Sequence, residues 1–373
     1  MEMHKPKRHK SSHQQQSGRR GSVDTSKPSA IFTPTGGRSH TLSIALPGSI
    51  IANAQSHDQK SYVAGTIARA LAVFCVDEVV IFDDDARQGK NSYANDLNTD
   101  EYTAFSDPSH FLAHILSYLE TPPYLRKHLF PMHPNLRTAG MLPSLDMPHH
   151  IRATEWCDYR EGVVIPDDGK GGDKGGVDIG KKRRKETSQA VDAGVPSSTV
   201  VDTGLPQKVS LPNIHIPEYT RVTVKFSSPD TPQRAEPVHP AAPREETGYY
   251  WGYSVRRCRS LSTVFTECPF DGGYDLSFGT SERGCSISKV LAEESIPKYR
   301  HLLVVFGGVA GIEAAIQADQ ELLDKGVTPD EAGKLFDYWV NVLPGQGSRT
   351  IRTEEAIWLG LMGLRPLVEA NGR

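Results

Sequence analysis

Apolar positions in the first part of the chain follow strand and helix periods in turn. Residues 41–46, T-L-S-I-A-L, alternate before a Pro-Gly pair, which predicts a strand closed by a turn. Ser56 and Gln59 then form an S-x-x-Q capping pattern, and apolar residues recur behind them at helical spacing. The run E-V-V-I-F at 78–82 is continuously apolar and ends in three aspartates, as expected for a buried parallel strand.

A second helical stripe follows these elements. Asp107 and Pro108 open it, apolar residues recur as far as Leu119, and Pro122 stops it. The succession of strand, helix, strand and helix predicts an α/β unit, because parallel strands need crossover connections and helices that cover both faces of their sheet.

The pattern changes between residues 151 and 260, where short strand-like runs replace the helical stripes. In Y-T-R-V-T-V-K-F, which ends at Phe226, apolar and polar residues alternate, so one face should be buried and the other exposed. This predicts a small, half-exposed β-barrel. Two segments inside it, the glycine-rich 167–198 and the proline-rich 227–247, are expected to be disordered loops.

The α/β pattern returns after residue 261. H-L-L-V-V-F at 301–306 predicts a buried strand, and 340–343 predicts a shorter one that ends at a proline. A final helix is expected from about Thr353 to about Gly363, with two glutamates in its first turn.

Length and composition then suggest how these parts are organised. A chain of 373 residues corresponds to about two globular domains, and we expect the barrel to interrupt one α/β domain made of residues 38–150 and 261–373. Hydrophobic residues are only 37% of the chain, so part of it should stay outside any core. Residues 1–37 hold seven basic and two acidic residues, which predicts a disordered basic tail.

Charge and cysteine usage exclude several classes of protein. The formal net charge of −3 is near neutral, so attraction to nucleic acid must come from local basic patches. The five cysteines contain no C-x-x-C pair and the histidines lack zincin spacing, so we expect neither a disulfide framework nor a metal site. No run reaches the roughly 18 apolar residues of a membrane span, which predicts a soluble intracellular protein.

Three glycine-rich turns near the C-terminus carry the candidate chemistry. They are F-G-T-S-E-R-G at 278–284, F-G-G-V-A-G at 306–311 and P-G-Q-G-S-R-T at 344–350. Glycines at strand ends let main-chain groups approach a planar ligand closely, and open α/β sheets bind ligands at that edge. A single glycine turn is more often only a turn, but three within about seventy residues favour a binding site.

The common nucleotide and hydrolase signatures are absent. Gly307, Gly308 and Gly311 do not have G-x-G-x-x-G spacing, and there is no G-x-x-x-x-G-K-[ST] phosphate loop. Ser281 lies one residue too far along its turn for a G-x-S-x-G elbow. Dehydrogenase, NTPase and serine hydrolase functions therefore lose support.

Longer motifs resemble a known family. They include G-R-S-H-T-L-S-I-A-L-P-G-S-I from Gly37, Y-D-L-S-F-G-T-S-E-R-G from Tyr274, V-V-F-G-G-V-A-G-I-E from Val304 and N-V-L-P-G-Q-G-S-R-T-I-R-T-E-E-A from Asn341. Together they resemble the SPOUT RNA methyltransferases of archaea and eukaryotes, a family with a human member linked to the mitotic spindle. The resemblance covers roughly residues 38–370.

This resemblance implies an α/β SPOUT domain with a C-terminal trefoil knot and an inserted OB-like β-barrel, although knots are rare in proteins. It also implies a homodimer and S-adenosylmethionine as the cofactor. The cofactor contacts carried over are Thr280, Arg283, Gly307, Gly308, Gly311, Asn341, Val342, Pro344, Gly345, Gly347, Ser348, Thr350 and Ile351.

Methyl transfer needs no metal and depends on positioning the donor methyl and the acceptor atom. Some related enzymes methylate N3 of uridine in ribosomal RNA, and that acceptor must lose a proton to a base or be stabilised by a cation. Candidates are Arg38, Glu313 and Arg352. Glu313 could equally be a first-turn helix charge, and the arginines could position phosphates.

Aromatic and basic clusters suggest where RNA would bind. Aromatic rings on an OB-like barrel can stack on bases, and arginines can follow the phosphates. The candidates are Tyr249, Tyr250, Trp251, Tyr253, Arg256, Arg257 and Arg259. Half of these rings are expected to face the core of the barrel instead. The basic tail and K-K-R-R-K at 181–185 could add salt-dependent affinity or direct nuclear import, or be solvated charge runs.

The sequence thus predicts a SAM-dependent RNA methyltransferase that acts on ribosomal RNA at uridine N3, without metal or membrane. It is expected in the nucleus and nucleolus, with the cytoplasm as a further compartment. The alternative is a catalytically inactive SPOUT-fold binding protein that acts in spindle, centrosome or ribosome assembly. A DNA methyltransferase is a third hypothesis.

Overall fold

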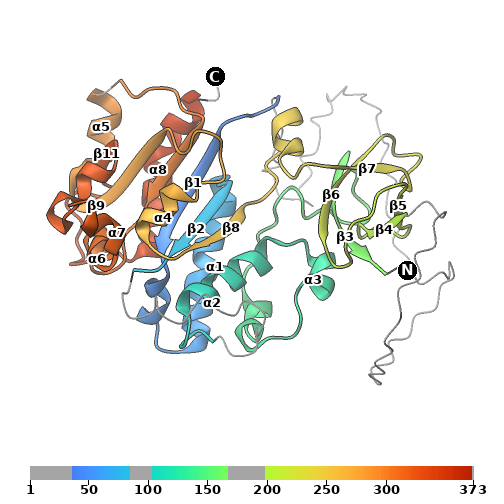
Figure 1. Ribbon diagram of the computed structural model, residues 1–373, viewed down its shortest axis with the longest axis horizontal. Coiled ribbons are helices and arrows are strands. Elements are labelled where there is room, and N and C mark those ends of the chain that lie inside the picture. Colours follow the sequence, from blue (N-terminus) through green and yellow to red (C-terminus); the bar gives the residue numbers. More distant parts are fainter. Residues whose placement is uncertain (1–35, 85–102, 167–197, 294, 372–373) are drawn as a thin grey trace, which may run out of the picture. The chain divides into compact units, whose positions relative to one another are not determined.

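The computed structural model describes residues 36–84, 103–166, 198–293 and 295–371, which build two β-sheets (Figure 1). Nearly all of the predicted basic tail at 1–37 and of the predicted loop at 167–198 lies outside the described residues, as does K-K-R-R-K at 181–185.

The larger sheet has six strands in the order β11-β9-β10-β1-β2-β8, and every neighbouring pair is parallel. The predicted α/β fold with a parallel sheet is therefore confirmed. Its strands are β1 (Thr41–Pro47), β2 (Glu78–Phe82), β8 (Ser254–Cys258), β9 (Leu276–Ser286), β10 (His301–Val305) and β11 (Tyr338–Asn341).

Helices cover both faces of this sheet, and each face has its own hydrophobic cluster. Alternate residues of β1 serve the two clusters: Ile44 faces one, and Ala45 faces the other. The first cluster includes residues of α1 (His57–Val73), α2 (Pro108–Glu120), α5 (Ile287–Glu293) and α8 (Thr353–Asn371). The second includes residues of α4 (Leu261–Thr266), α6 (Gly311–Ala318), α7 (Gln320–Asp324) and the 3-10 helix η6 (Pro329–Leu335).

The predicted helix starts are confirmed by their caps. The Ser56 hydroxyl accepts from the Gln59 backbone N–H at 3.2 Å, and the Gln59 side chain accepts from the Ser56 N–H at 3.2 Å, which completes the capping box of α1. The Asp107 carboxylate caps α2 by accepting from the His110 backbone N–H at 2.7 Å. No helix within the described ranges has the length and apolar character needed to cross a membrane.

The smaller sheet is antiparallel and lies in the chain between β2 and β8 of the parallel sheet. Its order is β5-β4-β3-β6-β7, and a bridge between Ser210 and Arg234 brings its two edges together, so the sheet is nearly closed. The strands are β3 (Tyr159–Ile165), β4 (Thr199–Asp202), β5 (Val209–Leu211), β6 (Arg221–Phe226) and β7 (Ala235–Val238). As predicted, the apolar residues of β6 are buried in one cluster. The domain boundaries given above stay a prediction.

Residues 227–247, expected to be a disordered loop, contain regular structure. Strand β7 pairs with β6, and Pro243–Thr247 form a π-helical turn, η5. Pro237 is tolerated in β7 because this strand has only one full ladder, as at a sheet edge. The proline content was therefore a poor guide to disorder here.

The aromatic and arginine cluster at 249–259 also differs from expectation, because β8 pairs with β2 in the parallel sheet. Tyr250 and Tyr253 are buried in the first hydrophobic cluster, where their hydroxyls donate to backbone carbonyls. Arg256 pairs with Glu78 at 2.9 Å, and Arg257 pairs with Asp107 at 2.9 Å. These two rings and two cations are structural and cannot stack on RNA bases or follow phosphates.

The C-terminal elements have other bounds than predicted. Strand β11 is Tyr338–Asn341 and not 340–343, so it lies two residues earlier, and α8 continues past Gly363 as far as Asn371. Leu364 of the added turns is buried, and Leu367 packs against the same cluster. Apolar burial therefore outweighs the low helix propensity of the glycine and of the proline that follows it.

The remaining elements are short. They are α3 (Pro123–Leu129) and the 3-10 helices η1 (Gly48–Asn53), η3 (Pro134–Leu136) and η4 (Ala139–Met141).

Candidate functional site

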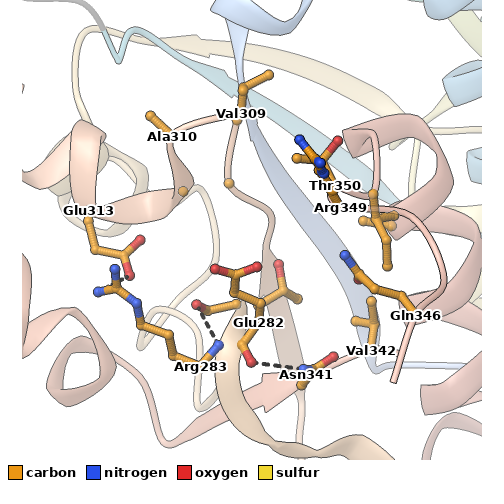
Figure 2. A pocket seen from close by; sticks show the side chains of 17 residues that line it. Glu282, Arg283, Val309, Ala310, Glu313, Asn341, Val342, Gln346, Arg349 and Thr350 are labelled. Atoms are coloured by element: carbon orange, nitrogen blue, oxygen red, sulfur yellow. Dashed lines mark hydrogen bonds and ion pairs between the residues drawn. The ribbon is translucent and has the colours of Figure 1, made fainter. Parts of the chain in front are cut away.

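The three predicted glycine-rich segments meet at the carboxyl edge of the parallel sheet, where one lies inside β9 and the other two follow β10 and β11. They enclose a cavity of about 420 Å³, within the range of roughly 300–1,000 Å³ typical of small-molecule sites. Figure 2 shows the side chains around it. The lining residues are Thr280, Ser281, Glu282, Arg283, Gly307, Gly308, Val309, Ala310, Gly311, Glu313, Asn341, Val342, Gln346, Arg349, Thr350, Ile351 and Ala356.

The first wall is a bulge inside β9, where a turn was expected. Trp339 of β11 lies opposite Gly279, but the next residue, Val340, lies opposite Cys285. The residues of β9 between these two pairs have no partner in the ladder, so they loop out over the cavity. We call residues 280–284 the β9 bulge.

Hydrogen bonds fix the three walls to one another. The Thr280 hydroxyl donates to the Val305 carbonyl at 3.1 Å, which joins the β9 bulge to the end of β10. The Asn341 amide donates to the Glu282 carbonyl at 2.9 Å, and the Thr353 hydroxyl donates to the Gly307 carbonyl at 2.9 Å. The cavity is therefore preformed by main-chain segments from three strands.

Two glycines of the second wall are required by its geometry. A Cβ on Gly307 would lie 2.8 Å from the carbonyl carbon of Gly311 and from the Ile312 nitrogen. Gly311 has a φ of 78°, a left-handed conformation that strains other residues. This turn brings its backbone close to the cavity because neither position carries a side chain.

Charged side chains surround the glycine walls. An Arg283 guanidinium nitrogen lies 3.5 Å from an Oε1 carboxylate oxygen of Glu313, and the two side chains meet at one side of the cavity (Figure 2). Glu282 and Arg349 also line the cavity and are exposed. Within the residues that the structure describes, no cluster of three His, Cys, Asp or Glu side chains could hold a metal ion.

The structure brings most of the predicted cofactor residues together. Those that line the cavity are Thr280, Arg283, Gly307, Gly308, Gly311, Asn341, Val342, Thr350 and Ile351. Those that do not line it are Pro344, Gly345, Gly347 and Ser348, which lie in the same loop.

The three predicted catalytic residues are placed differently. Glu313 lines the cavity. Arg352 follows the lining residue Ile351, but its exposed guanidinium is 4.0 Å from Glu354 and is not part of the wall. Arg38 makes a bidentate pair with Asp77 at 2.7 and 2.8 Å at the amino end of the parallel sheet, away from the cavity. Its geometry gives it a structural role there.

Several lining residues were not predicted from the sequence. They are Ser281, Glu282, Val309, Ala310, Gln346, Arg349 and Ala356. All but Ala356 lie within the three glycine-rich segments, so taking every residue of those segments as a candidate would have found them. Ala356 lines the cavity because α8 begins beside it.

A preformed cavity of glycine turns at the carboxyl edge of a parallel sheet defines a class of α/β protein that binds a small, partly planar ligand. The family model described as "Putative RNA methyltransferase" matches residues 41–364. The chain belongs to this RNA methyltransferase family, and the predicted family resemblance is confirmed.

Three relatives carry a more specific name, 28S rRNA (uridine-N(3))-methyltransferase. The Homo sapiens protein is 41% identical over 345 residues, which cover 90% of this chain and 81% of the human one. The Mus musculus protein is 42% identical over 339 residues, with coverage of 88% and 77%. The Drosophila melanogaster protein is 42% identical over 332 residues, with coverage of 87% and 62%.

Proposed function

We propose that this protein uses S-adenosylmethionine to methylate N3 of a uridine in the RNA of the large ribosomal subunit. The observation that carries the proposal is the glycine-walled cavity formed by the β9 bulge and the segments that follow β10 and β11. The name shared by the three relatives supports ribosomal RNA as the substrate and uridine N3 as the acceptor atom.

The cavity fits such a cofactor in size and in chemistry. Gly307 and Gly308 expose their main chain to it, and Asn341, Val342 and Thr350 form the opposite wall. Main-chain N–H and C=O groups at such turns can pair with the edge of an adenine, while the exposed Arg349 offers a cation to a carboxylate. These residues would hold the cofactor mainly through the backbone.

The bound cofactor would supply an activated methyl group on a sulfonium. The contribution of the chain is to hold the donor and the uridine in line and to shield them from water, which is positioning work. The N3 proton must be taken up, and Glu313 is the proposed group because it lines the cavity. Arg352, at the rim, is proposed to contact the RNA backbone.

We also propose that the C-terminal segment forms the trefoil knot of SPOUT proteins. After β11, at the edge of the sheet, the chain passes the β9 bulge and the turn at 307–311, and Thr353 bonds to Gly307. Helix α8 then packs against α1 and α5. This return of the chain to segments that precede it in the sequence supports the proposal.

The remaining parts of the proposal concern assembly and place of action. The nearly closed antiparallel sheet is proposed to be an OB-like barrel that contributes to RNA binding, and the active form is proposed to be a homodimer. An enzyme that modifies ribosomal RNA would work in the nucleolus, which imaging of the tagged full chain would test.

Cofactor binding is tested by calorimetry with S-adenosylhomocysteine, using a variant that fills the cavity. Thr350 is exposed and lines the cavity, so Thr350→Trp should fold normally yet lower the affinity by at least 10-fold. Thr231→Trp is the matched control, because Thr231 is exposed in a turn of the antiparallel sheet and should leave binding unchanged.

Methyl transfer is tested with labelled S-adenosylmethionine and fragments of large-subunit RNA, followed by mass spectrometry of the nucleosides. The proposal expects 3-methyluridine, and much less of it with Thr350→Trp. Absence of binding at millimolar ligand would instead favour an inactive binding protein. Incorporation into DNA and not RNA would favour a DNA methyltransferase.

A further inference from the structure

The cavity is bordered by two glutamates that differ in how their carboxylates are engaged. The carboxylate of Glu313 lies 3.5 Å from the Arg283 guanidinium. The Glu282 carboxylate makes no ion pair or hydrogen bond with any residue that the structure describes, although Glu282 lines the same cavity. Figure 2 shows Glu282 between the Arg283–Glu313 pair and Asn341.

The backbone of Glu282 is held rigidly even though its side chain is exposed. Its carbonyl accepts a hydrogen bond from the Asn341 amide at 2.9 Å. The residues on either side of Glu282 are bonded to each other, because the Ser281 hydroxyl accepts from the Arg283 N–H at 3.2 Å. Thr280, two residues before Glu282, is buried, and its hydroxyl donates to the Val305 carbonyl. Because this backbone is already fixed, a ligand that binds the carboxylate has to order only the Glu282 side chain.

The chemistry of a carboxylate restricts what it can bind. Its two oxygens only accept hydrogen bonds, so its partner in the cavity must be a donor or a cation. A nucleoside cofactor offers one adjacent pair of donors, the 2′- and 3′-hydroxyls of its ribose, and dinucleotide-binding folds recognise that group with an acidic residue. The amino-acid end of the cofactor carries an ammonium, which is also a donor, and beside it a carboxylate, which Glu282 would repel and which Arg349 would attract.

We infer that Glu282 is the ribose-recognition residue of this protein and accepts hydrogen bonds from the ribose hydroxyls of the cofactor. This inference rests on the proposed function, because it assumes a nucleoside cofactor in the cavity. Glu282 thereby fixes the nucleoside half of the ligand, while the glycine turns contact its base. The role is one of binding and specificity, and no proton is transferred.

The test is a cycle in which the side chain and the hydroxyls are removed separately and together. Calorimetry would compare S-adenosylhomocysteine with its 2′-deoxy and 3′-deoxy analogues on the wild type, Glu282→Ala and Glu282→Gln. Removing the carboxylate, or the hydroxyl it binds, should each weaken binding by about 10- to 100-fold, as for hydrogen bonds to charged groups. Removing the carboxylate and the hydroxyl together should weaken binding hardly more than removing either one alone.

Glu313→Ala is the matched control, because Glu313 is the other cavity glutamate and is engaged by Arg283. The change in affinity caused by Glu313→Ala should multiply with the loss of affinity caused by each deoxy analogue. If the loss of affinity from Glu282→Ala multiplied with the loss from each of the two deoxy analogues, the inference would be overturned. Both Glu282 variants should fold, since the side chain is exposed, and thermal unfolding would confirm this.

A second ligand distinguishes the ribose from the other donor group of the cofactor. 5′-Methylthioadenosine keeps the ribose and lacks the amino acid, so Glu282→Ala should weaken its binding by the same factor as that of S-adenosylhomocysteine. If only S-adenosylhomocysteine is affected, Glu282 binds the ammonium group and the inference is wrong. If neither is affected and only turnover falls, Glu282 acts on the RNA and the inference is equally wrong.

The outcomes also separate this inference from the proposed function. Micromolar binding of S-adenosylhomocysteine to the wild type, with no coupling between Glu282 and the hydroxyls, would leave the methyltransferase proposal standing and remove the inference alone. Failure of the wild type to bind any of the adenosine ligands would remove both.

Discussion

At the scale of single residues, the shape of the cavity depends on glycines, which have no side chain. Gly307 faces the backbone of Gly311 and Ile312 at a distance that leaves no room for a methyl group. A larger residue would have to push the turn at 307–311 outward, and that turn forms one wall of the cavity. Stability and ligand binding are therefore linked at this position.

We predict that Gly307→Ala lowers the free energy of unfolding by about 1–3 kcal/mol, the usual cost of an added methyl group in a packed site. It should also weaken binding of S-adenosylhomocysteine. Thermal unfolding and calorimetry would measure the two effects. Gly140→Ala is the control, because a Cβ at Gly140 meets nothing within 4 Å and should change neither. Equal melting temperatures for both variants would contradict this view of the turn.

The sequence identified the glycine-rich segments correctly but not the charges around them. Glycine marks a special backbone position wherever it occurs, so the clustering of glycines could be recognised without a structure. The partner of an arginine is set by tertiary contacts. Nothing near Arg38 in the sequence showed that it pairs with Asp77, and nothing near Arg283 showed that it faces Glu313.

At the scale of secondary-structure elements, caps and crossovers determine where the strands point. Helix α2 begins at the carboxyl end of β2 and leads back toward β8. One oxygen of Asp107 caps this helix, and the other lies 2.9 Å from Arg257 of β8. One side chain thus fixes the helix start and connects it to the edge strand.

We expect Asp107→Ala to destabilise the protein more than Asp107→Asn, by about 1 kcal/mol, because asparagine keeps the capping oxygen and loses only the charge. Urea denaturation of the two variants beside the wild type would measure the difference. If alanine and asparagine were equivalent, the cap would contribute nothing, and the ion pair alone would account for any loss.

Elements with a strong period were predictable, whereas those decided by tertiary contact were not. Strand β2 and the starts of α1 and α2 follow from the apolar pattern and the caps. The β9 bulge arises because β11 shifts its pairing from Gly279 to Cys285, and this shift depends on a strand more than fifty residues away. Local sequence carries no signal for it.

At the scale of the whole described chain, a buried ion network joins the antiparallel sheet to α2. Arg221 of β6 contacts Glu120 at 2.5 Å and Glu161 at 2.6 Å, and His149 lies 2.9 Å from Glu120. Burial alone would raise the pKa of Glu120, but Arg221 and His149 outweigh it and hold this pKa well below its usual range.

A depressed pKa in the folded state stabilises the protein above the unfolded value of about 4.3, and this stabilisation is lost as the pH falls toward the folded value. Arg221→Met should therefore lower the free energy of unfolding by about 3 kcal/mol at pH 7, since it leaves two buried carboxylates without their cation. Because burial without Arg221 raises the pKa of Glu120, the difference in free energy of unfolding between the wild type and Arg221→Met should begin to narrow above about pH 4.3 and narrow further at lower pH.

Chemical denaturation at several pH values would measure this gap. Lys225→Met is the matched control in the same strand, because Lys225 pairs with the exposed Glu246 and should leave the stability nearly unchanged at every pH. A gap between the wild type and Arg221→Met that did not vary with pH would show that the arginine acts through packing alone.

The order of the strands in the parallel sheet could not be predicted from the sequence. Periodicity indicated parallel strands, but the placement of β8 beside β2 depends on which buried face each strand finds in the folded chain. The tyrosines at 250 and 253 therefore looked like a binding surface and are core residues whose hydroxyls bond to backbone carbonyls of Leu71, Val76 and Leu116.

The contact between Glu120 and Gly252 has a consequence for how the protein can vary. A Cβ on Gly252 would lie 2.4 Å from the Glu120 carboxylate, so the chain departs from the end of α2 and comes back to the start of β8 at a single place. The stretch between these two points, well over a hundred residues long, includes the antiparallel sheet. We therefore expect that this stretch can be lengthened or shortened without shifting a strand of the parallel sheet, provided that Glu120 keeps its contact with Arg221.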